Sequence, residues 1–352
     1  MAEREIGFGV VGLGMGAYHA SAITQSNGAK LIALCDADEE RLNKTNEKFK
    51  VKAYTNYNDM LKDKEVEVVN ICTPSYLHVD MAILAINSGK HIIVEKPVDI
   101  NVDKINKLIE VGNKAEVKMS AIFQSRTYPL NKRIKDVIDK GRLGKMIGIH
   151  GLLPWYRAES YYQGKHGSWK GTWEKDGGGS LMNQGVHTVD LLQWFGGRVK
   201  SVFGAFNVFA HNIGAEDTTV AVLKFENGAI GTIATTTCAY PGLPQQVLLY
   251  GENGTISKEE EELKVWKIKG EREKEEETEM LNLYGSQEKR DVTTASDPMA
   301  VGSSGHVAFI ENMVDAIIND KETLVTIESA KHAVEIVTAV YESGKTGKEV
   351  FI

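Results

Sequence analysis

Lys96 is the first residue whose surroundings suggest chemistry, because it ends an apolar run in the segment IIVEKPVD. The run reads as a strand, and the carboxyl ends of strands in open parallel sheets face the ligand crevice. Pro97 restricts the backbone of Lys96, and the bond between them is a candidate for the cis form. A lysine held beside a cationic ligand loses its proton more easily, because like charges lower the pKa of an amine. Lys96 is therefore either an ordinary surface charge or a group that handles a proton.

A second group of chemically capable residues lies in DGGGSLMNQGVHTVDLLQW, residues 176–194. On a helix that begins near Ser180, the spacing places Asn183, His187 and Asp190 on one face. Three polar groups on an otherwise apolar helix form either a structural network or part of a binding site. The glycines at 177–179 favour the site, because they allow a bulky ligand to approach closely.

The segment GLGMGAYHA follows the apolar run IGFGVV and precedes a helical pattern. Gly12, Gly14 and Ala17 give the G-x-G-x-x-A spacing, in which backbone N–H groups and a helix N-terminus meet the phosphates of a dinucleotide. The alternative is a structural glycine turn. The flanking strand and helix favour the nucleotide, so we expect Gly12, Gly14, Met15 and Gly16 to bind a cofactor.

Asp36 ends the next strand, where a carboxylate can accept hydrogen bonds from the adenosine ribose. A carboxylate there repels the additional phosphate of NADP, and Asp38 adds to that repulsion. The sequence therefore predicts NAD as the cofactor. Arg41 is close enough along the chain to keep NADP possible.

Residues after the later strands complete the predicted cofactor site. Thr73 ends the predicted strand VEVVNICT, Pro74 follows it, and His78 opens the next helix; the alternative is a helix cap with an N-terminal proline. Gln124 and Arg126 lie in FQSRTYP, where the chain passes between the predicted domains, a usual place for ligands. Arg126 is either a surface residue or a bidentate partner for a carboxylate or phosphate.

The segment WYRAESYYQGKHGSWKGTW (155–173) combines aromatic and basic residues in one long loop. Aromatic rings stack on sugar faces, and basic side chains attract anionic groups; the alternative is an aromatic core under a loop. The basic residues favour an anionic sugar, such as a uronate or a nucleotide sugar, over a neutral cyclitol. The predicted substrate residues are Arg126, Trp155, Arg157, Lys170, Trp173, Asn183 and His187.

The elements that position these residues divide the chain at about residue 123. Short β-branched runs alternate with helical patterns over residues 1–123, which indicates a doubly wound parallel sheet, a Rossmann domain that binds NAD(P). Residues 124–352 contain longer strands with alternating apolarity and turn signals, which indicates an α/β domain with a large open, mainly antiparallel sheet. We expect this domain to bind substrate and form oligomer contacts. We leave open whether the final helix, about 328–345, packs back on the first domain.

Two parts of the second domain are harder to interpret. The highly charged segment 258–280 reads as an edge strand with exposed loops. His211 and His306 are expected in loops of the second domain.

The motifs VGLGMGAYHA, ICTPSYLH, EKPV and GGGSLMNQGVHTVDLLQW resemble the glucose–fructose oxidoreductase/inositol dehydrogenase family (Gfo/Idh/MocA). The resemblance extends over nearly the whole chain and includes the final AVEIVTAVYESGKTGKEV. It implies that the family's catalytic lysine and histidine correspond to Lys96 and His187. It also implies that Glu95 faces the cofactor ribose and that the turn from Thr73 to His78 lies along the nicotinamide ribose.

The resemblance also bears on the substrate. Inositol dehydrogenase-like members carry an aspartate where this chain has Asn183, so Asn183 is expected to orient a substrate hydroxyl. Asn at this position is similar to the branch that oxidises nucleotide-linked amino-sugar uronates. The open sheet commonly forms oligomer contacts in the family, which implies a homodimer or homotetramer.

These observations predict an NAD(P)-dependent oxidoreductase. It would transfer hydride between nicotinamide and a secondary hydroxyl or keto group of a sugar, a nucleotide sugar or a cyclitol. Such a reaction needs a base for the hydroxyl proton. We expect His187 to be the acid/base and Lys96 to polarise the oxygen, and the reverse assignment stays open. The alternatives are an NADPH-dependent keto-sugar reductase and a non-catalytic regulator that senses the cofactor.

Composition limits the classes of protein and of binding partner that fit the chain. A net charge of −7 disfavours nucleic acid as a partner. No apolar run approaches the roughly 18 residues that span a membrane. The three cysteines are far apart and show no zinc spacing, and there is no compact His/Asp ligand set, so no metal is expected. We expect a cytoplasmic protein whose cysteines are reduced.

Overall fold

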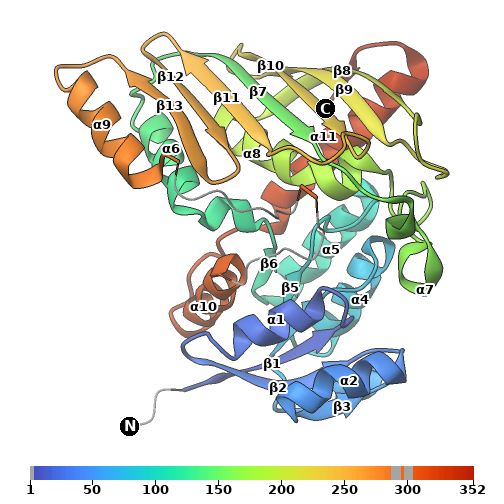
Figure 1. Ribbon diagram of the computed structural model, residues 1–352. Coiled ribbons are helices and arrows are strands. Elements are labelled where there is room, and N and C mark those ends of the chain that lie inside the picture. The colour runs from blue at the N-terminus through green and yellow to red at the C-terminus, as the bar shows by residue number, and fades with distance from the viewer. Residues whose placement is uncertain (1–3, 287–294, 297–303) are drawn as a thin grey trace. The chain divides into compact units, whose positions relative to one another are not determined.

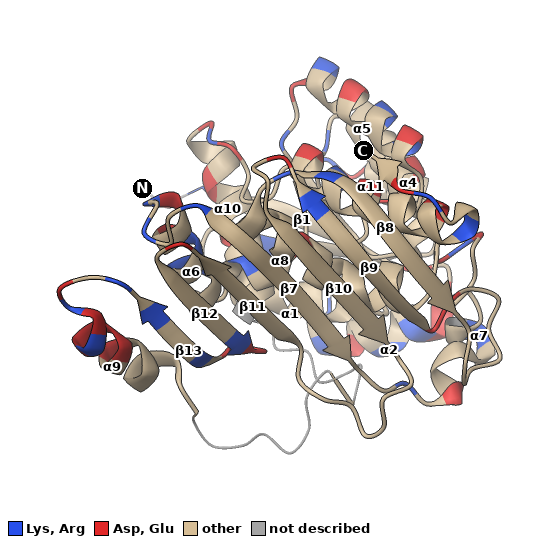
Figure 2. Cartoon of the chain, turned by 90° about the horizontal axis from the view of Figure 1, so that it is seen from above, with Lys and Arg blue, Asp and Glu red and all other residues tan. Residues whose placement is uncertain are grey.

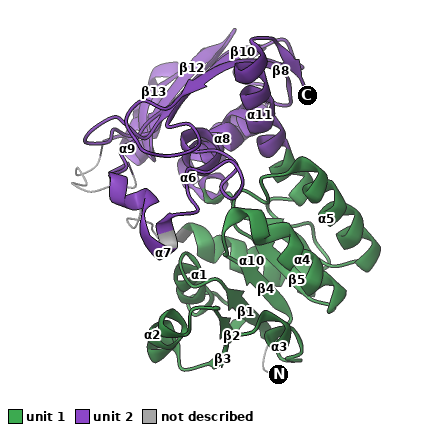
Figure 3. Cartoon of the chain, turned by 90° about the vertical axis from the view of Figure 1, so that its right-hand side faces the viewer, with its two compact units in different colours: residues 1–124, 302–331 green, residues 125–301, 332–352 purple. Residues whose placement is uncertain are grey.

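The computed structural model describes residues 4–286, 295–296 and 304–352. The chain divides into two compact units, residues 1–124 with 302–331 and residues 125–301 with 332–352 (Figure 3). The first boundary lies next to the one that the sequence indicates. Segment 302–331 differs from the sequence prediction, which assigned all of 124–352 to the second domain.

Unit 1 is built on a parallel sheet with the strand order β3-β2-β1-β4-β5-β6 (Figure 1). This is the order of the dinucleotide-binding doubly wound fold, which confirms the predicted fold class. The central strands are fully buried apolar runs, as expected for a sheet covered on both faces. The strands are β1 (Ile6–Val11), β2 (Ala29–Cys35), β3 (Lys52–Tyr54), β4 (Val68–Ile71), β5 (His91–Val94) and β6 (Met119–Ala121).

Helices connect these strands, and several begin at a residue whose side chain caps them. The side chain of Asp38 accepts a hydrogen bond from the N–H of Arg41, and Asn101 accepts from the N–H groups of Asp103 and Lys104. The helices of residues 1–124 are α1 (Gly16–Ile23), α2 (Glu39–Phe49), α3 (Tyr57–Leu61), α4 (His78–Asn87) and α5 (Val102–Ala115), with the short turns η1 (Ser75–Leu77) and η2 (Gln124–Thr127).

Helix α10 (Ser304–Ile318) belongs to unit 1 although it lies far along the chain. Its apolar residues, Phe309, Ile310 and Met313 among them, are buried, and the helix packs against α1 and β2. The carboxylate of Glu311 also accepts two hydrogen bonds from Asn27. The burial of this apolar face is the physical reason why the segment joins unit 1.

Unit 2 contains a mainly antiparallel sheet with the strand order β13-β12-β11-β7-β10-β9-β8-β14 (Figure 1). Strands β7 and β10 pair in parallel near its centre. The strands are β7 (Met146–Pro154), β8 (Val199–Asn207), β9 (Thr218–Phe225), β10 (Ile230–Thr236), β11 (Gln246–Gly251), β12 (Gly254–Glu259), β13 (Glu262–Ile268) and β14 (Val350–Phe351). The predicted open, mainly antiparallel sheet is confirmed.

The helices of unit 2 include the segment that carries His187. That segment begins as a π-helix, η4 (Ser180–Gly185), and continues as α8 (Val186–Gly196), whose Thr188 and Leu192 pack against Gly151 of β7. The other elements are α6 (Pro129–Asp139), η3 (Glu159–Tyr162), α7 (Gly164–Gly167) and α9 (Glu273–Tyr284), with α11 (Ile327–Thr346) continuing from unit 1 into unit 2.

The charged segment 258–280 is partly different from its prediction. β13 is an edge strand, as expected. Residues 273–284 form helix α9 and are not an exposed loop. Glu273, Glu275 and Glu276 occupy its first turn, where negative charge stabilises a helix through its dipole.

One face of the unit 2 sheet is exposed and apolar. A row of neighbouring residues crosses five strands from Phe203 through Val222, Thr232 and His150 to Leu248. Phe203, Val222 and Leu248 are 51%, 39% and 37% exposed. Figure 2 shows that the middle of strands β7, β9, β10 and β11 carries almost no charge. In the described part of the chain, none of the helices combines the length and apolarity needed to cross a membrane.

Candidate functional site

The glycine-rich turn between β1 and α1 has the geometry that phosphate binding needs. Gly12 has a φ of +86°, and a Cβ there would meet the main chain of Cys72 and Thr73 at 2.7–2.8 Å. At Gly14 a Cβ would meet Arg41 at 3.8 Å, so the backbone is open to a ligand. At Gly16 a Cβ would meet Val10 at 2.8 Å, which lets α1 pack closely on β1. Gly16, and not Ala17, is therefore the small residue that helix packing requires.

Asp36 lies at the end of β2 and fastens this turn. Its Oδ2 accepts a hydrogen bond from the N–H of Leu13 at 2.8 Å, and its Oδ1 accepts from the N–H of Asp38 at 2.8 Å. The Nε of Arg41 lies 3.1 Å from Asp36 Oδ2. The carboxylate and the guanidinium therefore share the place beside the glycine turn where the adenosine ribose is expected.

The ends of β4 and β5 are joined through His78. Its two ring nitrogens lie 2.8 Å from the carbonyl oxygen of Pro97 and 2.7 Å from that of Thr73. Burial lowers the pKa of His78. Both nitrogens face the main chain, so we assign His78 a positioning role for the two turns. The hydroxyl oxygen of Thr73 is buried without a hydrogen-bond partner among the described residues, which fits a polar ligand beside it.

Glu95 and Lys96 follow β5, and the Lys96–Pro97 bond is cis. Glu95 is buried, and its carboxylate accepts hydrogen bonds from the Nε2 of His19 at 2.7 Å and the N–H of Lys96 at 2.9 Å. Burial alone would raise the pKa of Glu95, but hydrogen bonding to His19 holds it well below its usual range. Lys96 is partly exposed, as are Pro74 and Gln124 at neighbouring strand ends, whereas Glu95 faces inward.

His306 differs from its prediction, because it lies in α10 of unit 1 and not in a loop of the second domain. Its ring packs edge-on against His19 with 4.8 Å between ring centroids. The partner helix α1 is almost 300 residues earlier in the sequence, so no local pattern could indicate this contact.

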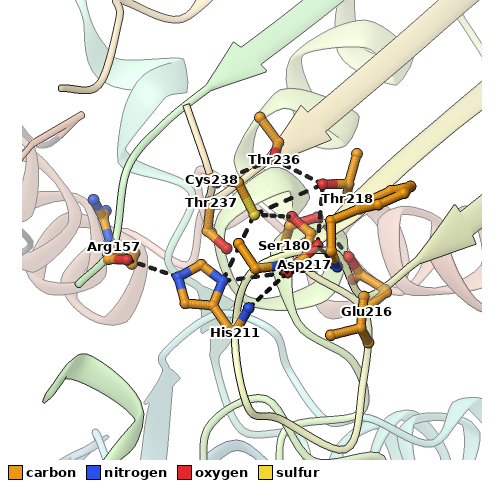
Figure 4. Close-up of polar contacts among 12 residues, drawn as sticks. Arg157, Ser180, His211, Glu216, Asp217, Thr218, Thr236, Thr237 and Cys238 are labelled. Atoms are coloured by element: carbon orange, nitrogen blue, oxygen red, sulfur yellow. Dashed lines mark hydrogen bonds and ion pairs between the residues drawn. The ribbon is translucent and has the colours of Figure 1, made fainter. Parts of the chain in front are cut away.

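In unit 2, other groups of the protein itself pack closely against the glycines that precede η4. A Cβ at Gly178 would meet the hydroxyl of Tyr341 at 2.2 Å, and one at Gly179 would meet the carbonyl oxygen of Glu216 at 1.8 Å. The expectation that these two glycines make room for a bulky ligand is therefore wrong. Ser180 donates to the carboxylate of Glu216 at 2.5 Å, and Figure 4 shows both side chains. Burial raises the pKa of Glu216.

Asn183 lies in a hydrogen-bond network that precedes His187. Its amide nitrogen donates to Asp176 at 2.6 Å, and its oxygen accepts from the Nε2 of Gln184 at 2.8 Å. Gln184 also donates to the hydroxyl of Tyr161 at 2.8 Å. His187, on the first turn of α8, is partly exposed among buried neighbours. The network fixes the side chain of Asn183, four residues before His187, and places a carboxylate, Asp176, behind it.

Asp190 occupies the third position of the polar face, where it is buried and binds Arg126. The two side chains form a bidentate ion pair with distances of 2.9 and 2.5 Å. The sequence offered Arg126 either as a surface residue or as a bidentate partner of a ligand's carboxylate or phosphate, and in the structure it binds the carboxylate of Asp190. The guanidinium of Arg126 therefore has a structural partner in Asp190.

The aromatic loop contributes both core and surface groups. Arg157 is 2% exposed, donates to the carbonyl oxygens of Tyr156 and Ala295, and lies 4.9 Å from the Trp155 ring. Trp155 is buried as well, so both residues contribute to the packing of the loop. The partly exposed Trp173 packs on Phe206 and Tyr341. The ammonium of Lys170 lies 3.7 Å from the ring centroid of Tyr161, close to the Asn183 network.

His211 lies in the loop between β8 and β9, as predicted, beside Cys238 and Asp217 (Figure 4). Its Nε2 donates to the carbonyl oxygen of Arg157 at 2.7 Å, and its Nδ1 lies 3.7 Å from the sulfur of Cys238. The carboxylate of Asp217 accepts hydrogen bonds from the main-chain N–H groups of residues 209–211. These hydrogen bonds occupy the carboxylate of Asp217 and hold residues 209–211 of the loop around it.

Comparison with known protein families shows which family the chain belongs to. The description "Oxidoreductase family, NAD-binding Rossmann fold" matches residues 6–123, and "GFO/IDH/MocA C-terminal domain" matches residues 131–257. The chain belongs to the Gfo/Idh/MocA oxidoreductase family. Unit 1 is accordingly an NAD-binding Rossmann domain, which confirms the cofactor prediction.

Several family members are similar over most of the chain. The myo-inositol 2-dehydrogenase of Thermotoga maritima is 29% identical over 257 residues, which cover 70% of this chain and 73% of that protein. The structure of the WlbA dehydrogenase from Bordetella pertussis, in complex with NADH and UDP-GlcNAcA, is 28% identical with a TM-score of 0.87 and covers 100% of this chain and 99% of that one. The WlbA dehydrogenase from Chromobacterium violaceum, with the same ligands, is 26% identical with a TM-score of 0.87, covering 100% and 97%.

Three residues of these networks have no role in the sequence-based prediction. His19 follows the glycine turn within the motif itself, and its position three residues after Gly16 is the signal that could have found it. Asp176 stands directly before the glycine run, which is a comparable signal. Glu216 lies in a loop without a local pattern, so its role could not be inferred from the sequence.

Proposed function

We propose that this family member is an NAD-dependent dehydrogenase that oxidises a secondary hydroxyl of an anionic, nucleotide-linked sugar of the uronate type. The observation that carries the proposal is the similarity to the two WlbA dehydrogenases, which extends over 100% of this chain at 28% and 26% identity. Both were crystallised with NADH and UDP-GlcNAcA. The myo-inositol 2-dehydrogenase of Thermotoga maritima is 29% identical over 257 residues, which makes a cyclitol the second candidate substrate.

In this proposal the cofactor lies on the glycine turn of unit 1. The open backbone at Gly14 receives the pyrophosphate, Asp36 binds the ribose, and the unpartnered hydroxyl of Thr73 binds further along the dinucleotide. Met15, Pro74 and Gln124 are partly exposed and are retained as cofactor contacts. When bound, NAD⁺ supplies the hydride acceptor.

The chain itself supplies the proton chemistry. His187 takes the proton of the substrate hydroxyl, and Lys96 donates a hydrogen bond to the same oxygen as it becomes a carbonyl. In the reverse assignment Lys96 takes the proton and His187 stabilises the oxygen. Both side chains are partly exposed, which is compatible with either assignment.

The substrate half of the proposal rests on the network around Asn183. Tyr161, Gln184 and Asn183 present hydroxyl and amide groups suited to sugar hydroxyls, and the Lys170 ammonium over the Tyr161 ring supplies positive charge for a carboxylate or phosphate. A neutral cyclitol would make no use of that charge.

Two alternatives are kept because specific observations favour them. The guanidinium of Arg41 lies beside Asp36 and could meet the additional phosphate of NADP, which favours a keto-sugar reductase that uses NADPH. The extensive internal hydrogen bonding of Asn183 favours a regulator that binds the cofactor without turnover.

A substrate panel tests the proposal. The purified protein is assayed for NADH or NADPH formation with UDP-GlcNAcA, with UDP-GlcNAc as the matched sugar without a carboxylate, and with myo-inositol. We expect turnover with NAD⁺ and a kcat/KM for UDP-GlcNAcA at least about tenfold above that for UDP-GlcNAc, since a hydrogen bond to a charged group contributes about that much. Preference for myo-inositol, or NAD⁺ binding without turnover of any of the three, would contradict it.

We also infer that the exposed apolar face of the unit 2 sheet is covered by a second copy of the chain, giving a homodimer or homotetramer. Contiguous apolar surface of this kind is unfavourable in water and typical of interaction sites. The five-strand row from Phe203 to Leu248 supports the inference.

A further inference from the structure

His19, Glu95 and His306 gather in unit 1 from three distant parts of the chain. His19 lies on α1, Glu95 follows β5, and His306 lies near the start of α10. One ring nitrogen of each histidine and one carboxylate oxygen of Glu95 all lie within 4.8 Å of one another, and all three residues are buried. Two imidazoles and a carboxylate are a donor set that binds zinc in proteins.

His306 has unused hydrogen-bonding capacity in this place. It is 1% exposed, and neither ring nitrogen has a hydrogen-bond partner among the described residues. Its Nε2 lies 3.6 Å from the Oε1 of Glu95, which is longer than a hydrogen bond. A buried ring whose nitrogens make no hydrogen bond is unfavourable, so the position calls for a ligand or a structural reason.

We propose that His19, Glu95 and His306 bind a divalent transition-metal ion, Zn²⁺ in the first place, with water as the fourth ligand. With zinc–ligand bonds of about 2.0–2.1 Å, the donor atoms of a tetrahedral site lie about 3.3–3.4 Å apart. The 3.6 Å between His306 and Glu95 is close to that separation. The 2.7 Å between His19 Nε2 and Glu95 lengthens as the ion replaces the proton that they share.

Coordination through Nε2 of His19 requires that the proton on this nitrogen move to Nδ1. At present the Nδ2 of Asn70 lies 3.0 Å from His19 Nδ1, so Nδ1 accepts and Nε2 carries the proton. The Oδ1 of Asn70 is buried without a partner. Rotation of the amide exchanges these two atoms, and Oδ1 then accepts a proton moved from Nε2 to Nδ1. The ring stays neutral, Nε2 becomes free to coordinate, and Asn70 orients it from behind, as groups behind metal-bound histidines commonly do.

The other His-containing group of this kind in the described residues, His211 with Asp217 and Cys238, carries no such proposal. The carboxylate of Asp217 is already occupied by main-chain N–H groups. The site at His306 is distinct because both ring nitrogens of His306 are buried without a hydrogen-bond partner among the described residues. The inference goes beyond the proposed dehydrogenase function and does not depend on it.

Metal content of untagged protein tests the proposal. Protein produced in zinc-supplemented medium is gel-filtered, and zinc is measured by mass spectrometry for the wild type, His306→Gln and the matched control His91→Gln. His91 lies in the same unit and accepts a hydrogen bond from the N–H of Lys118. We expect about one zinc per chain in the wild type and in His91→Gln, and loss of it in His306→Gln. Asn70→Ala should weaken binding about 10–100-fold.

Cobalt gives an independent readout on the wild type alone. Protein treated with chelator and titrated with Co²⁺ should develop the intense visible bands of a four-coordinate ion. Wild-type protein that retains no more zinc than His306→Gln, or a cobalt spectrum like that of the free ion, would overturn the proposal whether or not the variant folds. Loss of zinc from His91→Gln as well would also overturn the assignment to His306.

Discussion

Arg126 holds both carboxylate oxygens of Asp190, with Nε at 2.9 Å and Nη2 at 2.5 Å. Arg126 is 7% and Asp190 0% exposed, and the guanidinium also lies 5.5 Å from the Trp194 ring centroid. Burial raises the pKa of Asp190, and the charge of Arg126 acts against that rise. Asp190 lies three residues after His187, so this ion pair fixes the turn of α8 that carries the proposed acid/base.

Removing one partner of this pair should be costly. Arg126→Ala and Asp190→Ala each leave an uncompensated buried charge, which typically lowers the free energy of unfolding by about 3–5 kcal/mol. The double substitution Arg126→Met, Asp190→Leu should cost less than either. Urea denaturation measures the effect. The exposed pair of Arg133 with Asp136 is the control, because Arg133→Ala should cost about 1 kcal/mol or less. A loss at Arg126 equal to that at Arg133 would contradict the prediction.

Substitution of the two proposed catalytic groups should separate chemistry from cofactor binding. His187→Ala should lower kcat about 10²–10⁴-fold, because proton transfer by a positioned group contributes that much. The affinity for NAD⁺, measured by calorimetry, should change little. His91→Gln is the control and should keep full kcat. Unchanged turnover in His187→Ala would remove His187 from the chemistry.

The pH profile should then assign the base. If His187 takes the proton, Lys96→Met lowers kcat while the acidic limb of the kcat/KM profile remains. If that limb is lost in Lys96→Met and kept in His187→Ala, the reverse assignment is correct.

Asp36 and Arg41 should control which dinucleotide binds. Asp36→Ala should weaken NAD⁺ more than NADP⁺, because the ribose loses its acceptor while the repulsion of the additional phosphate is relieved. Arg41→Ala should weaken NADP⁺ more than NAD⁺. Dissociation constants for both cofactors measure this, and equal effects on the two in Asp36→Ala would refute its role at the ribose.

Stability should fall in acid through His19. Burial lowers the pKa of His19 from 6.5, so below pH 6.5 the unfolded chain takes up a proton that the folded chain does not. Stability therefore decreases as pH falls below 6.5, by up to about 1.4 kcal/mol per pH unit for one such group. Glu95 acts in the same direction at lower pH, because its pKa is held below the usual value. In protein freed of bound metal by a chelator, urea midpoints between pH 7.5 and 5.5 should change less steeply in His19→Gln than in the wild type, and an identical slope would exclude the assignment.

The exposed face of the unit 2 sheet gives a prediction about assembly. Val222→Glu places a charge on the exposed face of the unit 2 sheet, where Val222 is 39% exposed, and should shift the protein toward monomer in light scattering. Leu84→Glu changes an apolar residue on α4 that is 45% exposed and should leave the assembly unchanged. A wild-type monomer at working concentration would contradict the inference at once.

Local patterns of the sequence predicted the glycine turn, Asp36 at the end of β2 and the succession of strands, because each depends on neighbouring residues. They could not predict that Arg126 is occupied by Asp190 or that Gly179 makes room for Glu216, because those partners meet only in the folded unit. His306 was misplaced for the same reason, since α10 is defined by its packing on α1. The spacing with His187 and Asp190 drew attention to Asn183, but its hydrogen-bond partner Asp176 belongs to a loop without periodicity.

The return of α10 to unit 1 has a consequence for synthesis on the ribosome. The apolar surface of α1 and β2 that α10 buries must wait until residues near 318 have been translated. Until then the nucleotide-binding unit lacks helix α10 and leaves that apolar surface exposed. Most of the strands of the large unit 2 sheet have already been translated by that time. The part of the protein that is encoded first is therefore completed late, and a nascent chain is most exposed to aggregation during that interval.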